Sequence, residues 1–307
     1  YPLTLAGSNA YEGVTTVYTN GRVIITHANA LGGSAQGTVV NPAGILEIQN
    51  GLTVAEPLTL VNYNPGSLYF TSGSNTYSGL ITITGGQARI SNTGPYAHII
   101  GGITSVNSEV ILAGSSALRI GEKPILAGAR KLFSHNSGTT IFGVAGNVFA
   151  TFEAAGGAVQ MEVPNAWPAT LRLEVGVTYA RNSRIDLQGN DQTVGTLVSP
   201  VTNDGVRVIA STTGPATLTV NQGGDTEYNG GFGGELRLVK LGAGQLTVSG
   251  TNCFQNAQTV VGGGKLRILS EKTLGLVPES FVADRLVISD GASLLATGPC
   301  VLDDATR

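Results

Sequence analysis

Three segments of the chain repeat one another without gaps, and this repetition constrains the fold more than any other feature. Each copy has a Gly, an Asn two residues later and an aromatic residue two residues after that. The positions are Gly7, Asn9 and Tyr11 in the first copy, Gly73, Asn75 and Tyr77 in the second, and Gly250, Asn252 and Phe254 in the third. Self-similarity of this kind is typical of repeat architectures, in which each repeat packs only against its neighbours.

An alternating segment precedes each copy, and a turn and a further strand-like segment follow it. The preceding segments are 3–5, 68–70 and 246–248, and the following strands end at 22–24, 87–90 and 265–268. Alternation with a period of two residues predicts strands with one buried face. We expect the Gly to permit a positive-φ bend, the Asn to satisfy backbone groups in the turn, and the aromatic ring to cover the corner. These repeat residues are therefore predicted to be structural.

The rest of the chain shows the same pattern of short strands between Gly-rich turns. Further strand-like segments are 45–48, 58–60, 110–112, 117–120, 140–142, 158–161, 171–173, 184–187, 206–209, 217–220 and 285–288. Short strands at this spacing leave almost no room for crossover helices, which favours a parallel β-helix over a sandwich. We expect one all-β solenoid over 1–307, with a loop excursion allowed within 120–170, where the pattern blurs.

Composition excludes several other classes of protein. The chain has 307 residues, 44 of them Gly, without the three-residue period of collagen. Its 41% hydrophobic residues argue against disorder. The 17 Lys and Arg do not outnumber the 20 Asp and Glu, so we expect no nucleic-acid partner. No apolar run is long enough to span a bilayer, so we expect no membrane span either.

Residues 238–254 resemble the autotransporter-associated β-strand repeat. That repeat reads approximately Leu-x-Lys-x-Gly-x-Gly-x-Leu-x-Leu-x-Gly-x-Asn-x-Tyr, and this segment reads LVKLGAGQLTVSGTNCF. Similar phrases extend the resemblance over 1–90 and 185–307. The resemblance implies a right-handed parallel β-helix in an exported, surface-associated or secreted bacterial protein, which often carries a C-terminal outer-membrane barrel.

The chain departs from that repeat in three respects. Cys253 and Asn256 replace small residues in the third copy, the Lys-Gly-Gly lead-in is missing before the first two copies, and no segments typical of an outer-membrane barrel are present. The chain begins within a strand-like segment and ends abruptly, so we interpret it as a fragment of a longer protein. Attachment to a cell surface is not supported by these residues themselves.

Candidate catalytic residues are few and scattered. Glycoside hydrolysis requires two carboxylates across a groove, and the candidate pairs are Asp186 with Asp191, Asp225 with Glu227, and Asp303 with Asp304. The stretch that holds Asp225 and Glu227 is more simply interpreted as a polar turn. His27, His98 and His135 lack a second ligand at a zinc-binding spacing. We therefore expect no catalytic residue, no metal and no cofactor.

Cys253 and Cys300 lie about two coils apart if each coil takes about 20–25 residues, a separation of roughly 10 Å at β-strand spacing. A disulfide requires a shorter Cα separation. This favours two unpaired thiols.

The leading hypothesis is a structural rod without enzymatic activity, which spaces or displays other elements at a bacterial surface or outside the cell. Adhesion to host-surface or matrix glycans and end-to-end or lateral assembly into filaments are further roles that such a rod permits. The alternative is a carbohydrate-active or glycan-binding β-helix, such as a lyase, a hydrolase or a tailspike-like module. A lateral groove lined by the candidate carboxylates, with Tyr228 or Trp167 as aromatic platforms, would favour the alternative.

Overall fold

A computed structural model describes residues 1–61, 67–176, 182–199, 205–250, 253–298 and 300. The chain divides into two compact units, unit 1 (Tyr1–Thr151) and unit 2 (Phe152–Arg307). Parallel sheets form a β-solenoid of about 11 turns in total, with essentially no helix among the described residues. The prediction of an all-β parallel solenoid is thus confirmed. Each unit is described by itself below.

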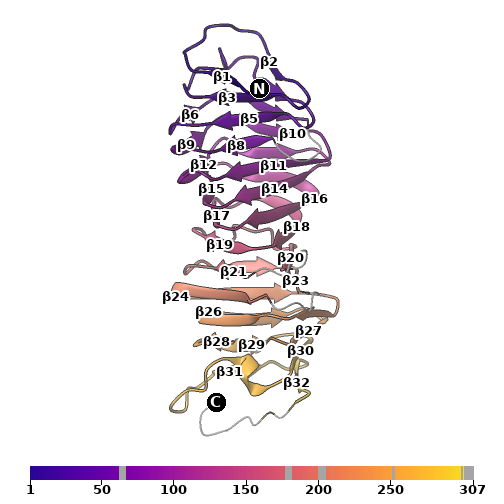
Figure 1. The fold of residues 1–307 in the computed structure, drawn as a ribbon. Coiled ribbons are helices and arrows are strands. Elements are labelled where there is room, and N and C mark those ends of the chain that lie inside the picture. The colour runs from indigo at the N-terminus through magenta and orange to yellow at the C-terminus, as the bar shows by residue number, and fades with distance from the viewer. Residues whose placement is uncertain (62–66, 177–181, 200–204, 251–252, 299, 301–307) are drawn as a thin grey trace. The chain divides into compact units, whose positions relative to one another are not determined.

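Unit 1 consists of short strands (Figure 1). They are β1 (Leu3–Leu5), β2 (Thr15–Val17), β3 (Arg22–Ile25), β4 (Thr38–Val40), β5 (Ile45–Ile48), β6 (Thr53–Val54), β7 (Leu58–Leu60), β8 (Leu68–Phe70), β9 (Ser74–Tyr77), β10 (Ile81–Ile83), β11 (Gln87–Asn92), β12 (Tyr96–Ile99), β13 (Ile103–Ser105), β14 (Glu109–Gly114), β15 (Ala117–Gly121), β16 (Ile125–Asn136) and β17 (Thr139–Gly143). Strand β18 (Val148–Ala154) crosses the boundary into unit 2.

The strands of unit 1 stack in three parallel columns, and each turn of the chain contributes one strand to a column. The first column is β2-β4-β7-β10-β13, the second is β1-β3-β5-β8-β11-β14, and the third is β6-β9-β12-β15-β17. The long strand β16 pairs with β13 through its first residues and with β14 through its last. We call one turn of the chain a rung.

The register of the columns keeps identical faces aligned. Ile81 of β10 lies between Leu58 of β7 and Ile103 of β13, and all three side chains are fully buried. The side-chain hydrogen bond from Gln87 to Glu109 joins residues 22 positions apart, which is one rung. Because inward residues always meet inward residues of the next rung, the apolar core is continuous along unit 1.

One corner of unit 1 contains buried amides. Asn92, Gly114 and Asn136 occupy equivalent positions at the ends of β11, β14 and β16. The Nδ2 of Asn92 donates to the Ala117 carbonyl at 2.7 Å, and that of Asn136 donates to the Ser116 carbonyl at 2.9 Å. Gly114 has φ +122°, and a Cβ there would lie 1.9 Å from the Asn92 carbonyl oxygen. A side chain at position 114 is therefore excluded by the stacking itself.

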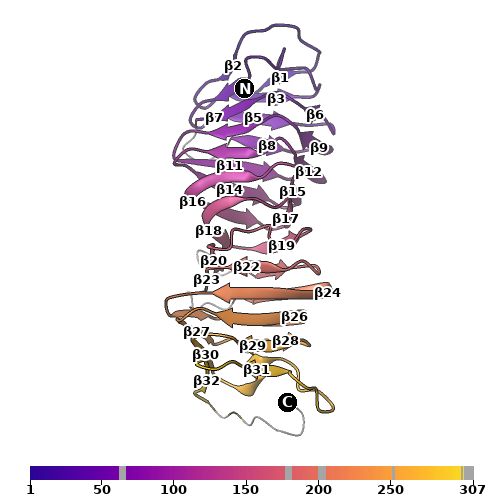
Figure 2. The same cartoon turned by 180° about the vertical axis from the view of Figure 1, so that it is seen from behind.

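Unit 2 has the same plan, with short strands and two long ones of 15 and 11 residues (Figure 2). Its elements are β19 (Gly157–Met161), β20 (Arg172–Val175), β21 (Ser183–Asp186), β22 (Gln192–Val194), β23 (Thr196–Val198), β24 (Arg207–Asn221), β25 (Thr226–Tyr228), β26 (Gly231–Leu241), β27 (Gln245–Val248), β28 (Phe254–Gln255), β29 (Thr259–Val261), β30 (Lys265–Ile268), the 3₁₀ helix η1 (Glu271–Leu274), β31 (Leu286–Ile288) and β32 (Ser293–Ala296).

Unit 2 also has three parallel columns. The first runs β20-β23 and, through a bridge between Ser199 and Tyr228, on to β25-β27-β30-β32. The second runs β19-β21 and then through the first halves of β24 and β26 to β28, and the third runs from β22 through the second halves of β24 and β26 to β29 and β31. A register shift between Ser211 and Ala216 divides β24 into its two halves. The chain thus turns a corner there without leaving the sheet.

The structure replaces two turns of the sequence interpretation with strands. Residues 226–228, expected within a polar turn, form β25, and the second repeat copy extends through β9 rather than a turn. Residues 120–170, for which a loop excursion was allowed, contain the whole of β16, β17, β18 and β19. The expectation of one solenoid over 1–307 stays a prediction.

Candidate functional site

The second repeat copy links adjacent rungs of unit 1. Gly73 has φ +71°, and a Cβ there would lie 2.2 Å from the backbone nitrogen of Gly51. The amide of Asn75 accepts from the backbone N–H of Leu52 at 2.9 Å, and its Nδ2 donates to the carbonyls of Ser72 and Gly73 at 2.9 and 3.1 Å. Both Asn75 and Tyr77 lie in β9 and are fully buried.

Tyr77, the aromatic residue of this copy, lies in the core. Its hydroxyl donates to the backbone carbonyl of Glu56 at 2.7 Å. Burial, and then the charge of Glu56, raise the pKa of Tyr77 well above its ordinary value. The phenol therefore stays protonated and holds the preceding rung in place.

The first and third copies are arranged differently. Asn9 donates from Nδ2 to the Ala30 carbonyl at 2.6 Å, and Tyr11 is 41% exposed with its hydroxyl 2.7 Å from that of Thr15. Gly7 has no neighbour within 4 Å of where a Cβ would lie. In the third copy, a Cβ on Gly250 would lie 2.2 Å from the Gly230 carbonyl oxygen, and Phe254 begins β28. Asn252 lies outside the described residues.

The candidate carboxylates of unit 2 bond to neighbouring rungs. Asp186 is 5% exposed and accepts from the backbone N–H and the hydroxyl of Thr212, at 3.1 and 2.5 Å. Asp191 accepts from the backbone N–H of Thr217 at 2.6 Å. These partners are 26 residues along the chain, so both carboxylates fasten one rung to the next.

The second candidate pair is used in the same way. Asp225 accepts from the backbone N–H of Gln245 at 2.8 Å, and Glu227 accepts from the hydroxyl of Ser249 at 2.5 Å. These partners are 20 and 22 residues away. Asp303 and Asp304 lie outside the described part of the chain.

The two aromatic residues suggested as surface platforms are both in the core, so that suggestion was wrong. Tyr228 is fully buried against Phe232, with ring centroids 5.2 Å apart, and its hydroxyl donates to the Gly231 carbonyl at 3.2 Å. Trp167 is 3% exposed and packs 5.6 Å from Phe152. Tyr228 pairs with Val248 of the next rung, which is also buried, so the register of this column places the Tyr228 ring on the inward face.

The histidines and cysteines do not gather. His27 accepts from the backbone N–H of Asn29 at 3.1 Å, His98 bonds Arg119, and His135 packs edge-on to Phe133. Within the described ranges, no three His, Cys, Asp or Glu residues are grouped to hold a metal ion. Both thiols are free; Cys253 is buried, which raises its pKa.

A buried lysine lies near the start of the repeat segment of unit 2. Lys240 of β26 is fully buried, and its Nζ donates to the carbonyls of Leu241, Gly242 and Gly263 at 2.6, 3.0 and 3.3 Å. Burial lowers the pKa of Lys240, and the charge of Asp225 opposes that shift. The lysine therefore joins two turns that are one rung apart.

Unit 1 holds a buried residue of the opposite charge, the carboxylate of Glu47. Glu47 is 2% exposed and forms an ion pair with Arg22. It also accepts from Thr71 at 2.6 Å and from Gln49 at 2.7 Å. Burial acts to raise its pKa, but these hydrogen bonds and the Arg22 charge outweigh that effect and leave the pKa of Glu47 below its ordinary value.

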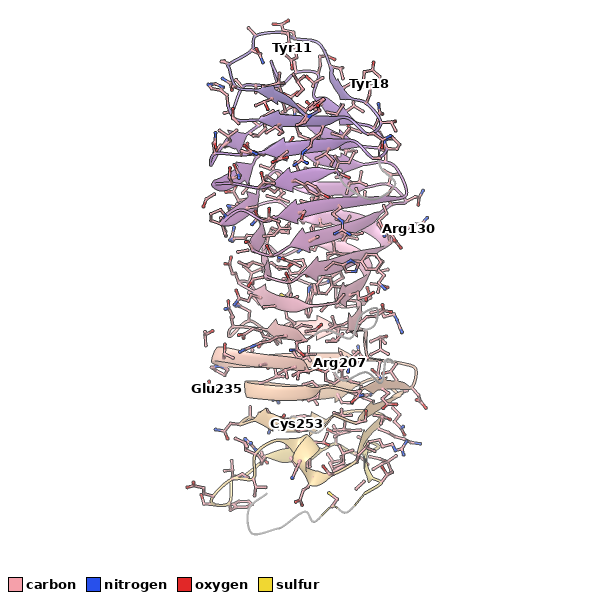
Figure 3. The ribbon with its side chains drawn as sticks, viewed as in Figure 1. Tyr11, Tyr18, Arg130, Arg207, Glu235 and Cys253 are labelled. Carbon is pink, nitrogen blue, oxygen red and sulfur yellow. The ribbon has the colours of Figure 1, made fainter. Side chains whose placement is uncertain are left out.

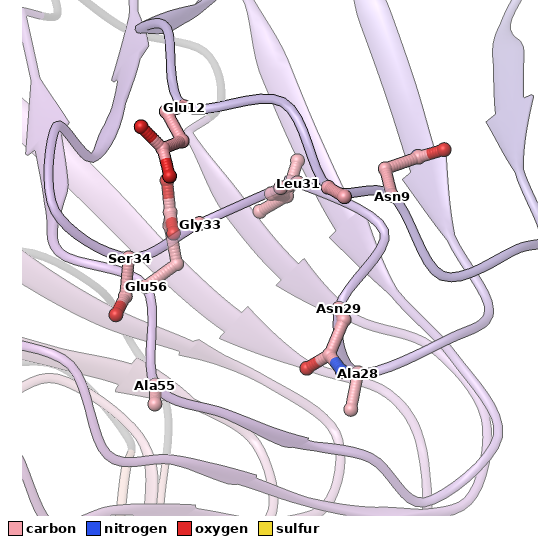
Figure 4. Close-up of a pocket in the computed structure, with 11 residues that line it drawn as sticks. Asn9, Glu12, Ala28, Asn29, Leu31, Gly33, Ser34, Ala55 and Glu56 are labelled. Atoms are coloured by element: carbon pink, nitrogen blue, oxygen red, sulfur yellow. The ribbon is translucent and has the colours of Figure 1, made fainter.

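One cavity of unit 1 has the size of a small-molecule site. It has a volume of about 370 Å³ and lies between the loop after β1, the loop after β3 and the residues that follow β6 (Figure 4). Its polar lining comes from Asn9, Glu12, Asn29, Ser34 and Glu56. The side chains of Glu12 and Glu56 extend toward each other past Gly33 in this view.

Glu56 forms the buried part of this cavity. The residue is 5% exposed, and the hydroxyl of Thr38 donates to its Oε1 at 3.3 Å. Burial raises the pKa of Glu56, and the Thr38 hydrogen bond offsets part of that shift. Sequence reasoning did not find this cavity, because Glu12 and Glu56 lie two rungs apart in irregular segments.

Neither a membrane-spanning helix nor a similar protein adds to this geometry of the described residues. Among the described residues, no helix is long and apolar enough to cross a membrane. Comparisons with protein-family models, with curated proteins and with solved structures found no match. What the chain itself establishes is a parallel β-solenoid whose candidate polar residues bond mainly to neighbouring rungs.

Proposed function

We propose that the chain is a structural β-solenoid of the autotransporter-associated repeat type, without enzymatic activity and without a metal, cofactor or nucleic-acid partner. It would form the rod-like part of an exported bacterial surface or extracellular protein. The observation that carries the proposal is the use of the polar side chains. Asp186, Asp191, Asp225 and Glu227 each accept a hydrogen bond from the next rung, as a scaffold requires.

The mechanism of such a scaffold is mechanical. Each strand pairs in parallel with strands of the rungs on either side, so a bending force is shared along whole columns. The inter-rung bonds of the carboxylates and of Lys240 add to these columns at the corners. The stiffness of the rod then comes from the hydrogen-bonded columns as a whole rather than from any one residue.

Three measurements test this proposal. Small-angle scattering of the full chain would show an elongated particle; a compact sphere would refute the rod. Incubation with plant and bacterial polysaccharides would release no reducing ends. If release occurs and Asp186→Asn abolishes it without loss of folding, the protein is an enzyme. Immunogold electron microscopy of the source cells tests export, because cytoplasmic labelling alone would contradict it.

We further propose that copies of residues 1–307, taken as a separate polypeptide, associate end to end. Among the described residues, exposed large apolar side chains concentrate in the first and last rungs: five lie within residues 1–18 and seven within 269–295. Strands β1 and β2 begin two columns of unit 1, and β31 and β32 end two columns of unit 2, so each has one paired neighbour. Unpaired strand edges with apolar side chains favour pairing with another chain.

A charge placed at such an edge tests the association. Tyr18 is 74% exposed just after β2 (Figure 3), and Tyr18→Lys should reduce concentration-dependent assembly in sedimentation velocity runs. Val106 is 64% exposed in the loop after β13, so Val106→Lys is the matched control. A wild-type chain that remains monomeric at all concentrations, or equal effects of the two variants, would refute end-to-end association.

A further inference from the structure

The cavity of unit 1 has walls that are fixed before any ligand arrives. The loop after β1 and the loop after β3 are joined by three hydrogen bonds: Asn9 N–H to the Asn29 carbonyl at 3.0 Å, Asn9 Nδ2 to the Ala30 carbonyl at 2.6 Å, and Gly33 N–H to the Tyr11 carbonyl at 2.8 Å. A preformed site loses less conformational entropy on binding than a flexible one.

Gly32 permits the close approach of these two loops. Its φ is +86°, and a Cβ there would lie 2.4 Å from the Tyr11 carbonyl oxygen and 2.8 Å from the Tyr11 ring. The Tyr11 hydroxyl is in turn bonded to Thr15, which donates to the Leu31 carbonyl at 3.2 Å. The wall beside Leu31 is therefore held by backbone and side chain together.

The lining of the cavity offers both donors and acceptors of hydrogen bonds. Asn9 and Asn29 contribute amides, Ser34 a hydroxyl, and Glu12 and Glu56 carboxyl groups. Leu31 and three alanines supply apolar surface between them. Such alternation of polar groups and small apolar patches matches a ring that has hydroxyl groups on its rim and C–H groups on its faces.

The charged residues that line the cavity limit the class of ligand that it can bind. No Lys or Arg is among the residues that line the cavity, while two carboxyl groups are. A phosphate, a sulfate or an acidic sugar would therefore meet repulsion without a compensating cation. The described residues also lack a group of three metal-ligating side chains. The cavity volume of about 370 Å³ is within the range of small-molecule sites.

We propose that this cavity binds a neutral sugar ring, with Glu12, Glu56 and Asn29 as hydrogen-bonding partners of its hydroxyl groups. The inference is independent of the scaffold proposal, since a rod can carry such a site or lack it. The bound ring would lie between the rungs that hold β1, β3 and β6, at one side of the solenoid.

The test uses the full chain and a defined panel of probes. Methyl glycosides of glucose, galactose, mannose and N-acetylglucosamine are titrated by saturation-transfer NMR, with methylammonium and inorganic sulfate as competing ligand classes. At least one glycoside should bind, with a Kd of about 1 mM as expected for a single small ring. Sulfate should not bind in the cavity, because no Lys or Arg lines it, and methylammonium tests whether the two carboxyl groups select a cation instead of a sugar.

Two adjacent substitutions locate the binding. Ser34 and Ala35 are both exposed, but only Ser34 lines the cavity. Ser34→Trp fills the cavity and should weaken glycoside binding about tenfold or more, whereas Ala35→Trp should leave it within about twofold. Glu12→Ala, at an exposed position, should weaken binding about three- to tenfold and serves as the second variant if Ser34→Trp fails to fold.

Three results would overturn the proposal. The first is that no glycoside of the panel binds to the wild-type chain. The second is that Ser34→Trp, or Glu12→Ala in its place, binds as well as the wild type. The third is that methylammonium or sulfate binds where no glycoside does. None of these results bears on the rod, which the scattering measurement decides separately.

Discussion

Replacing Lys240 by Met removes the donor that joins two adjacent turns of unit 2. The variant fills nearly the same volume but leaves the carbonyls of Gly242 and Gly263 without their bonds at 3.0 and 3.3 Å, while the Leu241 carbonyl loses its 2.6 Å bond and keeps only that from the Gln222 N–H at 3.3 Å. A buried acceptor without a partner costs about 1–3 kcal/mol, while removal of a buried charge returns part of its desolvation penalty. We therefore expect Lys240→Met to lower the free energy of unfolding of unit 2 by about 2–3 kcal/mol.

The sole Trp of the chain makes this measurable for unit 2. Trp167 is 3% exposed and packs against Phe152 within that unit, so its fluorescence during urea unfolding reports on the unit that holds Lys240. Lys265→Met, at an exposed position of β30, is the control and should change stability by no more than about 0.5 kcal/mol. If Lys240→Met and Lys265→Met both unfold at the wild-type urea midpoint with an unchanged slope, the hydrogen bonds of Lys240 stabilise unit 2 by no more than the desolvation of its charge costs. Our reasoning then fails.

Three further predictions concern unit 1. Gly114→Ala should destabilise it by at least about 2 kcal/mol, seen as faster hydrogen exchange in peptides around β11 and β14, because the new Cβ would lie 1.9 Å from the Asn92 carbonyl oxygen; wild-type exchange rates would contradict this. Tyr77→Phe should cost about 1 kcal/mol in thermal unfolding through loss of the 2.7 Å bond to the Glu56 carbonyl, and an unchanged transition would show that the bond is without net value. Glu47→Gln should destabilise the chain at neutral pH, and the difference should shrink as pH falls below 4.5 through the lowered pKa of Glu47, as measured by urea unfolding followed by far-UV circular dichroism. A difference that stays constant with pH would contradict the last prediction.

The fold could be predicted from the sequence because its main signal is local. Segments such as 58–60 and 217–220 alternate with a period of two residues, and they lie in β7 and β24 with their inward side chains buried. Prediction failed where a polar segment flanked by glycines was interpreted as a turn. Residues 226–228 form β25 instead, because each of them pairs with a residue of β27 in the next rung.

The polar residues were harder to place for a physical reason. Sequence spacing puts Asp225 and Glu227 on one strand face, but it does not reveal that Gln245 and Ser249 of the next rung supply their hydrogen bonds. The alternation of Leu236, Leu238 and Lys240 does place the lysine among inward residues, so its burial could have been inferred. The cavity depends on three irregular loops, which carry no periodic signal.

The hydrogen bonds between rungs join residues that are separated by similar lengths of chain, such as 20 residues for Asp225 with Gln245, 22 for Gln87 with Glu109 and 29 for Ser183 with Ala154. The entropy lost on closing a loop depends on the length of that loop, so the last turn to form meets a penalty similar to that of the first. The rungs can therefore form one after another during synthesis, because each new rung pairs with the rung that formed before it. Duplication of a segment of this length would lengthen the solenoid without requiring any existing turn to be remade.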